Sequence, residues 1–326
     1  MVNVMKTICY LFLLSILLIV FSSSVVFSFE GPLQVKNQYP IFIHANEPYL
    51  EKASMESSFS ASLSHSSTYT VQNSSNWVIH LDMEITELNF RYKRIIKDFI
   101  EFDMDMPVLV FSDGFMDGFL DSYHSAFGFP DYGRSNRPLN DFLYEVRRDG
   151  NLVIKGKTGI GIGDIRFAFK KPLISSNGFN LSIKGDIELP SGSAKKGYGN
   201  GSVDAGVSIL LDKGISDAVI TYWNFGAVFP GDVKGYQKVN LEDYVYGGAA
   251  IEAALGKSFS LLAQVQGQSA IYPKTDLLAV DRSAYLLALG GRYSSGKNSF
   301  ELSLSEDINT SGAPDFIVNL TYKIKL

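Results

Sequence analysis

Four side chains that could bind a metal ion or move a proton recur at regular spacing in the first half of the chain. Asp113, Asp117 and Asp121 are four residues apart, and His124 follows three residues later. On a helix near residues 112–125, this spacing places all four side chains on one face. The stretch predicts either a site for a hard cation such as Ca²⁺ or acid–base chemistry, or a surface helix in a loop with a merely solvated acidic side.

A second group of ionisable residues alternates with apolar ones, which places its members on one face of an extended strand. If the apolar residues face lipid, the charged residues face the interior of a β-barrel, and acids face bases across it. The candidates are His80, Asp82, Glu84, Glu101, Asp103, Asp105, Arg166, Lys170 and Lys184. Two interpretations stay open: a polar path through the barrel, or a salt-bridged plug that fills it.

Catalytic motifs give little support for an enzyme. No serine stands in a G-x-S-x-G context, although the chain keeps four histidines. His65 has the parity of the apolar residues around it, where a lipid-cleaving base would lie, but an isolated histidine there is more simply interfacial. The glycines of "GKTGIGIGD" fit neither a phosphate-binding loop nor a dinucleotide fingerprint. We expect no catalytic residue and no bound cofactor beyond the Ca²⁺ candidate.

The elements that position these residues show a period of two. In "FNLSIKGDIELP", Phe179, Leu181 and Ile183 share one face while Asn180 and Lys184 share the other. The same alternation gives about twelve strands of roughly ten residues. Their expected ranges are 53–69, 78–92, 99–106, 162–173, 179–190, 202–212, 217–229, 244–256, 259–271, 283–293, 299–305 and 316–326.

Connections between these strands alternate between short and long. "ISSNG", "DKGIS" and "SSGKN" are tight turns, whereas the long, polar connections lie near 66–77, 107–157, 190–201, 230–243, 272–282 and 306–315. Short periplasmic turns and long extracellular loops are typical of a transmembrane barrel. The pattern predicts an all-β, antiparallel, up-and-down barrel over residues 29–326. Its final strand, "FIVNLTYKIKL", closes against the first, because lipid tolerates no unpaired edge.

The N-terminal segment reads as a secretory signal. Lys6 precedes an apolar run from Ile8 to Phe21, and three serines interrupt that run before a possible cleavage site after Ser28. The alternative is an uncleaved anchor that carries a periplasmic β-domain, because the segment is long enough to cross a bilayer. Cys9, the only cysteine, lies in this segment, so the remaining chain can form no disulfide.

The charge and aromatic content of the chain indicate which kinds of molecule it contacts. Charged residues make up 19% of the chain and the net charge is −5, without a basic patch. Nucleic acid is therefore not an expected partner. Aromatic residues stand near several strand ends, for example Tyr69, Trp77 and Tyr293, as in the interfacial girdles of membrane barrels. Outer-membrane lipid is the expected environment.

Several stretches carry a family resemblance. "GFMDGFLDSYHSAFGFPDYGR", "GIGDIRFAFKKPL", "SEDI" and "APDF" resemble a domain-of-unknown-function family of bacterial outer-membrane proteins. The face formed by Val318, Leu320, Tyr322, Ile324 and Leu326 resembles the C-terminal sorting signal of such barrels, although it ends on Leu. The resemblance implies an outer-membrane barrel that meets the barrel-assembly machinery during biogenesis, and it supplies no catalytic residue.

The sequence therefore predicts a narrow channel or transport pore for an unidentified small solute, or a structural membrane protein. The alternatives are a lipid-modifying barrel enzyme and an anchored periplasmic β-domain.

Overall fold

The computed structural model describes residues 29–128, 133–134, 137–309 and 311–326. The predicted signal segment, residues 1–28, lies outside the described residues. None of the described helices is long and apolar enough to cross a membrane.

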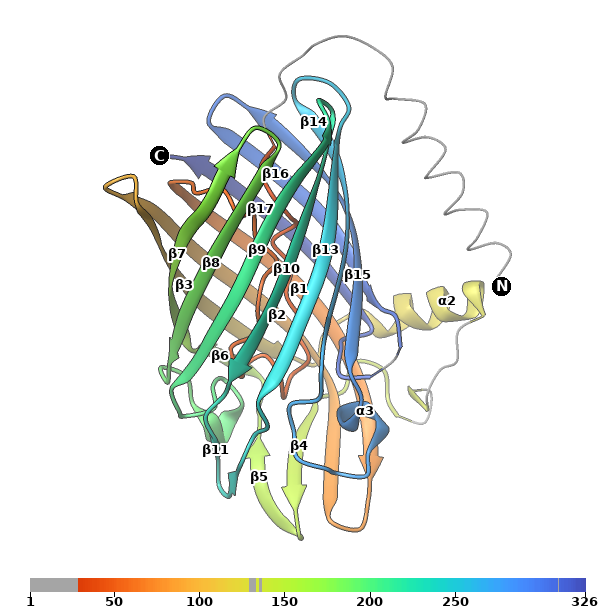
Figure 1. Cartoon of the computed structure of the whole chain (residues 1–326). Helices are drawn as coiled ribbons and strands as arrows, with labels where there is room; N and C mark the ends of the chain where they lie inside the picture. The colour runs from red at the N-terminus through yellow and green to blue at the C-terminus, as the bar shows by residue number, and fades with distance from the viewer. Residues whose placement is uncertain (1–28, 129–132, 135–136, 310) are drawn as a thin grey trace.

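Twelve antiparallel strands form a closed ring, which confirms the predicted barrel (Figure 1). The first strand pairs with the last from Ser58↔Lys325 to Ser67↔Phe316, and this pairing closes the wall. The wall strands are β1 (Ser58–Asn73), β2 (Trp77–Ile96), β3 (Ile100–Ser112), β7 (Ile165–Ser176), β8 (Phe179–Leu189), β9 (Asp204–Ser216), β10 (Val219–Phe229), β13 (Tyr244–Ala254), β14 (Phe259–Gln268), β15 (Ala284–Ser295), β16 (Asn298–Asp307) and β17 (Phe316–Lys325).

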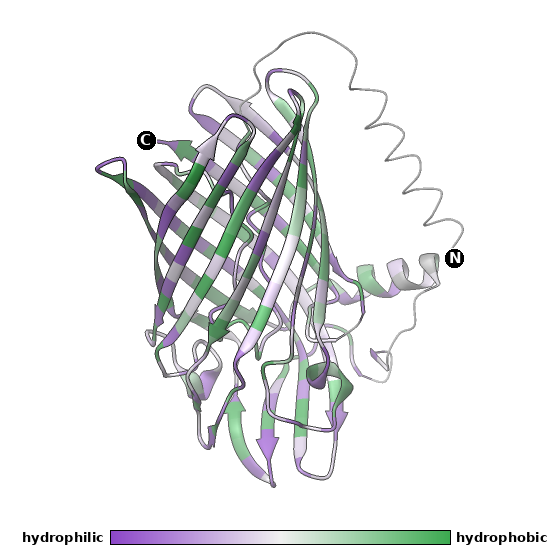
Figure 2. Ribbon diagram, in the orientation of Figure 1, coloured by the Kyte–Doolittle hydropathy of each residue, from purple (hydrophilic) through white to green (hydrophobic). Residues whose placement is uncertain are grey.

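Alternation along each wall strand separates an apolar outer face from a polar inner face, and Figure 2 shows the resulting bands. On β16, Phe300, Leu302 and Leu304 are about half exposed, whereas the intervening Glu301 and Ser303 are buried. A soluble barrel would show the opposite arrangement. The outer face is thus built to contact hydrocarbon.

The two rims of the barrel differ. Turns of two to four residues join five strand pairs at one rim, which we call the short-turn rim; they span 97–99, 177–178, 217–218, 255–258 and 296–297. At the opposite rim, the connections carry the remaining elements. These are α2 (Asp117–Phe127), β4 (Leu143–Arg148), β5 (Asn151–Lys155), β6 (Gly159–Ile162), η2 (Ala194–Lys196), β11 (Val233–Lys234), β12 (Lys238–Val239) and α3 (Leu278–Asp281).

One predicted long connection, near residues 66–77, is wrong. These residues continue β1 and β2 as a paired hairpin that ends at Asn73↔Val78, so only residues 74–76 connect the strands. The extension is stable because β2 also pairs with β4, from Trp77↔Arg148 to Asp82↔Leu143, and β4 pairs with β5. Strands β1, β2, β4 and β5 therefore extend the wall past the rim that lies opposite the short-turn rim.

The segment before the first strand occupies the lumen. Residues 29–57, which we call the plug segment, form neither helix nor strand; most of these residues are buried and the rest are partly buried. Glu30 near its start and Glu56 near its end both pair with Lys323. The segment thus enters and leaves at the short-turn rim and turns back inside the barrel, where it is visible as the red trace in Figure 1.

The tip of the plug segment, residues 39–45, lies in an apolar core at the opposite end of the barrel. Tyr39, Ile41, Phe42 and Ile43 pack there against side chains from β2, β4, β5 and the long connections. Among these partners, Trp77 and Tyr272 meet edge-on at a centroid distance of 6.0 Å. The barrel therefore contains a core like that of a soluble protein at one end and charged groups towards the other.

Candidate functional site

The candidate site is the filled lumen at the level of the charged wall residues. Six of the predicted lumen residues point inward, and each is at most 5% exposed. They are Glu101, Asp103, Asp105, Arg166, Lys170 and Lys184.

Wall residues of opposite charge pair across neighbouring strands. The Nε of Arg91 lies 3.0 Å from both carboxylate oxygens of Asp103. Nη2 of Arg166 donates to Asp105 at 2.8 Å, and the ammonium of Lys170 lies 2.9 Å from Glu101. The last two pairs join adjacent strands in register, because strand pairing places Arg166 opposite Asp105 and Lys170 opposite Glu101, whereas Arg91 stands opposite Asp105 and reaches Asp103 diagonally. Buried charges need such partners to persist.

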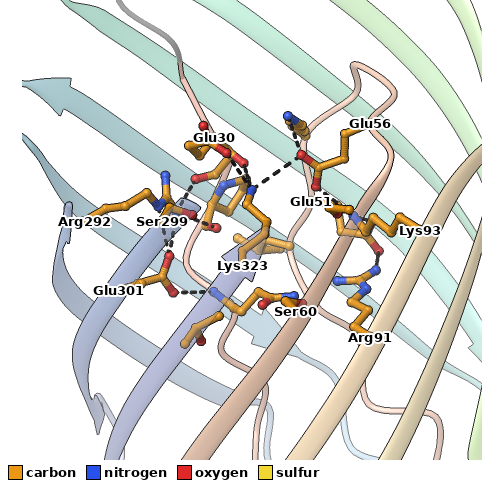
Figure 3. Close-up of a pocket in the computed structure, with 17 residues that line it drawn as sticks. Glu30, Glu51, Glu56, Ser60, Arg91, Lys93, Arg292, Ser299, Glu301 and Lys323 are labelled. Carbon is orange, nitrogen blue, oxygen red and sulfur yellow. Dashed lines mark hydrogen bonds and ion pairs between the residues drawn. The ribbon is translucent and has the colours of Figure 1, made fainter. Parts of the chain in front are cut away.

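The plug segment adds one carboxylate to this network. Glu51 lies 2.7 Å from the Arg91 guanidinium and 3.0 Å from the Lys93 ammonium (Figure 3). It also pairs with Lys184. Next to it, the ring of Tyr49 contacts the guanidinium groups of Arg91 and Arg166 at 5.2 and 5.3 Å. Glu51 and Tyr49 of the plug segment thus both contact basic side chains of the wall.

The two ends of the plug segment are fixed at the short-turn rim. Glu30 pairs with Lys323 at 2.9 Å and with Lys325, while Glu56 pairs with Lys52 at 2.7 Å. Glu30, Glu56 and Lys323 lie around a cavity of about 30 Å³ (Figure 3). That volume holds about two water molecules. The lumen at this level is therefore closed to larger solutes.

Wall side chains also satisfy the backbone of the plug segment, which has no helix or sheet to do so. Buried carbonyl groups need hydrogen-bond donors, and here the wall supplies them. Ser182 donates to the Ala53 carbonyl at 2.6 Å, and Tyr244 donates to the Ala45 carbonyl at 2.9 Å. Arg292 donates to the Gly31 carbonyl at 2.8 Å and also pairs with two wall glutamates. These contacts fix the path of the segment from rim to tip.

The prediction that His80, Asp82 and Glu84 line the lumen is wrong. On β2, the odd-numbered residues face inward along the whole strand, from Ile79 to Lys93. The sequence is misleading because the apolar residues change parity near Thr86 without a bulge in the pairing. From Trp77 to Ile85, β2 lines the apolar core at the long-connection end of the barrel. Apolar side chains therefore face inward there, and charged side chains face outward.

Asp82 and Glu84 are buried because a connection covers the outside of the wall there. The described part of this connection, residues 113–128, 133–134 and 137–142, is called the outer loop. Glu84 accepts hydrogen bonds from the backbone N–H groups of Phe115 and Met116 at 2.9 and 2.6 Å. Asp82 pairs with Arg137 at 2.5 Å. Both carboxylates thus hold the outer loop against the wall.

His65 also takes part in the contact between the outer loop and the wall. It faces outward, as predicted, and its two ring nitrogens lie 2.8 Å from the Thr86 hydroxyl and 2.7 Å from Glu84. Its ring stacks on Phe115 at a centroid distance of 4.9 Å. The geometry assigns His65 to docking of the outer loop.

The four predicted metal ligands do not share one helix face. Helix α2 begins at Asp117, so Asp113 precedes it. Asp117 pairs with Arg134 and accepts the N–H of Asn140, and the side chain of His124 lies outside the described ones. Within the described residues, no group of three His, Cys, Asp or Glu side chains could hold a metal ion. Binding of Ca²⁺ stays a prediction.

The plug segment was not predicted as a lumen element. A signal was present, because residues 29–57 mix apolar and charged side chains with three prolines after the leader and lack the alternation of the strands that follow. Such a segment cannot be a wall strand, yet it is too apolar for an exposed tail. Pattern alone does not say where it packs.

The chain belongs to the DUF3187 family, proteins of unknown function, whose sequence profile matches residues 8–326. A comparison with curated proteins finds no match. Among solved structures, the COG4313 outer membrane channel from Pseudomonas putida F1 matches at 12% identity and a TM-score of 0.56, covering 84% of this chain and 96% of that chain. A NanC porin matches at 6% identity and a TM-score of 0.50, covering 82% and 100%. These similarities show a shared fold, the barrel of outer-membrane channels.

Proposed function

We propose that this protein is an outer-membrane channel for a small solute and that the plug segment closes it. The observation that carries the proposal is the path of residues 29–57, which fill a polar lumen from one rim and leave by the same rim. The proposal assigns no catalytic residue and no cofactor.

The wall does not need the plug segment to stay closed as a sheet. All twelve strands pair with their neighbours through backbone hydrogen bonds, and of the plug segment only its last residue, Ser57, accepts a backbone N–H next to that pairing, from Leu326. Because both ends lie at the same rim, the segment can withdraw without breaking a strand pair. In the charged half of the barrel many of its contacts are ion pairs and hydrogen bonds, which water and ions can replace, and Leu33 and Val35 add an apolar contact with Leu262 and Ala288.

Burial of the apolar tip makes a large contribution to the free energy needed to withdraw the plug segment. Ile41 and Phe42 are at most 1% exposed, and Ile43 is 6% exposed. Full burial of three such side chains contributes on the order of 5–9 kcal/mol as an upper estimate. The closed state is therefore dominant at rest, and opening requires a trigger or a weakened tip.

The location follows from the outer face and the fold. An apolar outer face on a closed barrel is stable in a bilayer and unstable in water. We place the short-turn rim and both ends of the plug segment on the periplasmic side, and the long connections outside. This orientation requires export by the predicted N-terminal signal and insertion by the barrel-assembly machinery.

Planar-bilayer recording tests the proposal. The plug-weakened variant carries Phe42→Ala and Glu51→Gln; the matched control carries Phe300→Ala on the lipid-facing side and Glu242→Gln on an exposed connection. Wild type and control should stay silent, whereas the weakened variant should show discrete current steps. If a correctly folded weakened variant, judged by heat-modifiable gel migration, is as silent as wild type, the barrel is a structural protein.

A further inference from the structure

The plug carboxylate of Glu51 occupies a basic site in the wall. Its oxygens bind Arg91, Lys93 and Lys184, which β2 and β8 project into the lumen, and all four side chains are at most 7% exposed. A planar guanidinium with two ammonium groups is a common arrangement for binding carboxylate or phosphate oxygens. Glu51 is thus bound as a ligand would be.

The three basic groups differ in how much the wall itself neutralises them. Arg91 keeps Asp103 at 3.0 Å, and Lys93 lies 3.8 Å from Glu101. For Lys184, Glu51 is the one salt-bridge partner among the described residues. Withdrawal of the plug segment therefore leaves Lys184 without a salt-bridge partner among the described residues.

Once the plug segment is excluded, the ion pairs of the wall leave one basic group of this site unpaired. Glu101, Asp103 and Asp105 pair with Arg91, Lys93, Arg166 and Lys170, whereas Lys184 has no salt-bridge partner in the described wall. The wall carboxylates Asp186 and Asp212 bind the plug segment instead, through Asn46 and the backbone N–H groups of Ala53 and Ser54. Deeper in the lumen the sign reverses: Glu87 binds Lys36 of the plug segment at 3.1 Å, and Glu188 accepts the N–H of Asn46. The basic site formed by Arg91, Lys93 and Lys184 is thus a local feature of the short-turn half.

We propose that Arg91, Lys93 and Lys184 form the binding site for an anionic solute, whose carboxylate or phosphate group takes the place of Glu51. This inference rests on the proposed channel function and names its substrate class. Glu51 is then an internal competitor: it is tethered close to the site, so an external anion must exceed its high effective concentration. Solute binding and release of the plug segment favour each other by linkage.

Chemical complementation tests the site without any current measurement. Glu51→Ala in the full chain removes the carboxylate and should lower the melting temperature in neutral detergent. Acetate should restore it by about 2 °C or more beyond NaCl of equal ionic strength. A parallel titration with inorganic phosphate shows which anion the site prefers. Glu47→Ala is the matched control, because Glu47 is a buried plug carboxylate whose side chain binds Gln268.

A second variant makes the result specific. In Glu51→Ala, Lys184→Gln, the acetate effect should disappear, because the basic site has lost its otherwise unpaired member. If Glu51→Ala does not fold, Glu51→Gln preserves the shape of the side chain, and an isotopically labelled acetate should bind it and not the wild type. Equal effects of acetate and chloride, or equal rescue of Glu47→Ala, would overturn the anion site.

Failure of this inference and failure of the channel are separable. Current through the plug-weakened barrel without selective acetate rescue would leave a channel whose solute is not an anion. Selective rescue in a barrel that never conducts would leave an anion-binding plug contact in a closed protein, and the substrate assignment would fall with the channel.

Discussion

At the scale of single residues, Glu84 was predicted to line the lumen but instead binds the outer loop. Its carboxylate binds two backbone N–H groups just before α2 and the ring of His65, outside the barrel. Glu84→Ala should release the outer loop and leave the wall intact, since the wall pairing does not involve that side chain. Limited proteolysis should then cut within residues 113–142 at least several-fold faster, with unchanged heat-modifiable migration.

The control for this variant is Glu242→Ala, an exposed carboxylate on another connection. Equal protection of the outer loop in Glu84→Ala and wild type would show that Asp82, Arg134 and the apolar contacts hold it without Glu84.

His44 makes the plug tip sensitive to acid. Its side chain is 1% exposed, neither ring nitrogen has a hydrogen-bond partner within the described residues, and burial lowers its pKa to about 4. A histidine whose pKa is lower in the closed state than when withdrawn binds protons on withdrawal. The closed state is then fully stable above about pH 6.5 and loses stability as the pH falls from there towards 4.

His44→Phe should remove this dependence. In the plug-weakened background, lowering the pH from 7.5 to 5 should raise the open probability of the channel that keeps His44 more than that of the channel with the His44→Phe substitution. The same pH response in both would place the titrating group elsewhere.

At the scale of elements, the wall strands could be predicted because lipid and lumen impose opposite polarity on alternate residues. The twelve predicted ranges correspond to the twelve wall strands. The first strand begins at Ser58 and not at residue 53, because residues 53–57 belong to the plug segment. The face of β2 near Asp82 and Glu84 could not be predicted, because alternation reports two faces without saying which of them meets lipid. There, the outer loop and the apolar core reverse the usual assignment.

Helix α2 lies outside the barrel (Figure 1). Met116 and Leu120 pack on Phe316 of β17, and the Phe119 and Phe316 rings are 6.0 Å apart. Phe119 nevertheless stays 53% exposed, next to the lipid-facing side of β17, where Leu320 is 52% exposed. We expect α2 to lie at the membrane interface with Phe119 among the lipids.

Tryptophan quenching tests this position. A chain with Trp77→Phe, Trp223→Phe and Phe119→Trp carries a single tryptophan on α2. Brominated lipids should quench its fluorescence by roughly half or more, as expected for an interfacial side chain, whereas a tryptophan at exposed Tyr236, on the β11–β12 connection, should be quenched less. Equal quenching at both positions would contradict an interfacial α2.

At the scale of the whole molecule, the main feature is that the plug segment fills the lumen of the barrel. The sequence left open whether the interior is a path or a salt-bridged plug, since about twelve strands enclose a lumen of intermediate width. The structure shows a lumen filled by residues from the same chain. Period and spacing cannot predict this, because the partners of Glu51 and Glu30 lie 40 to 295 residues away.

The central claim is that withdrawal of the plug segment opens the barrel, and one recording tests it in a single molecule. Cysteines at Ala53 and Ser182, whose carbonyl and hydroxyl are 2.6 Å apart, would tie the plug segment to β8 in the plug-weakened background; loss of free thiols confirms the bond. We expect silence while the disulfide is intact and current steps after a reducing agent is added to the same bilayer. Current of equal size before and after reduction would contradict the claim.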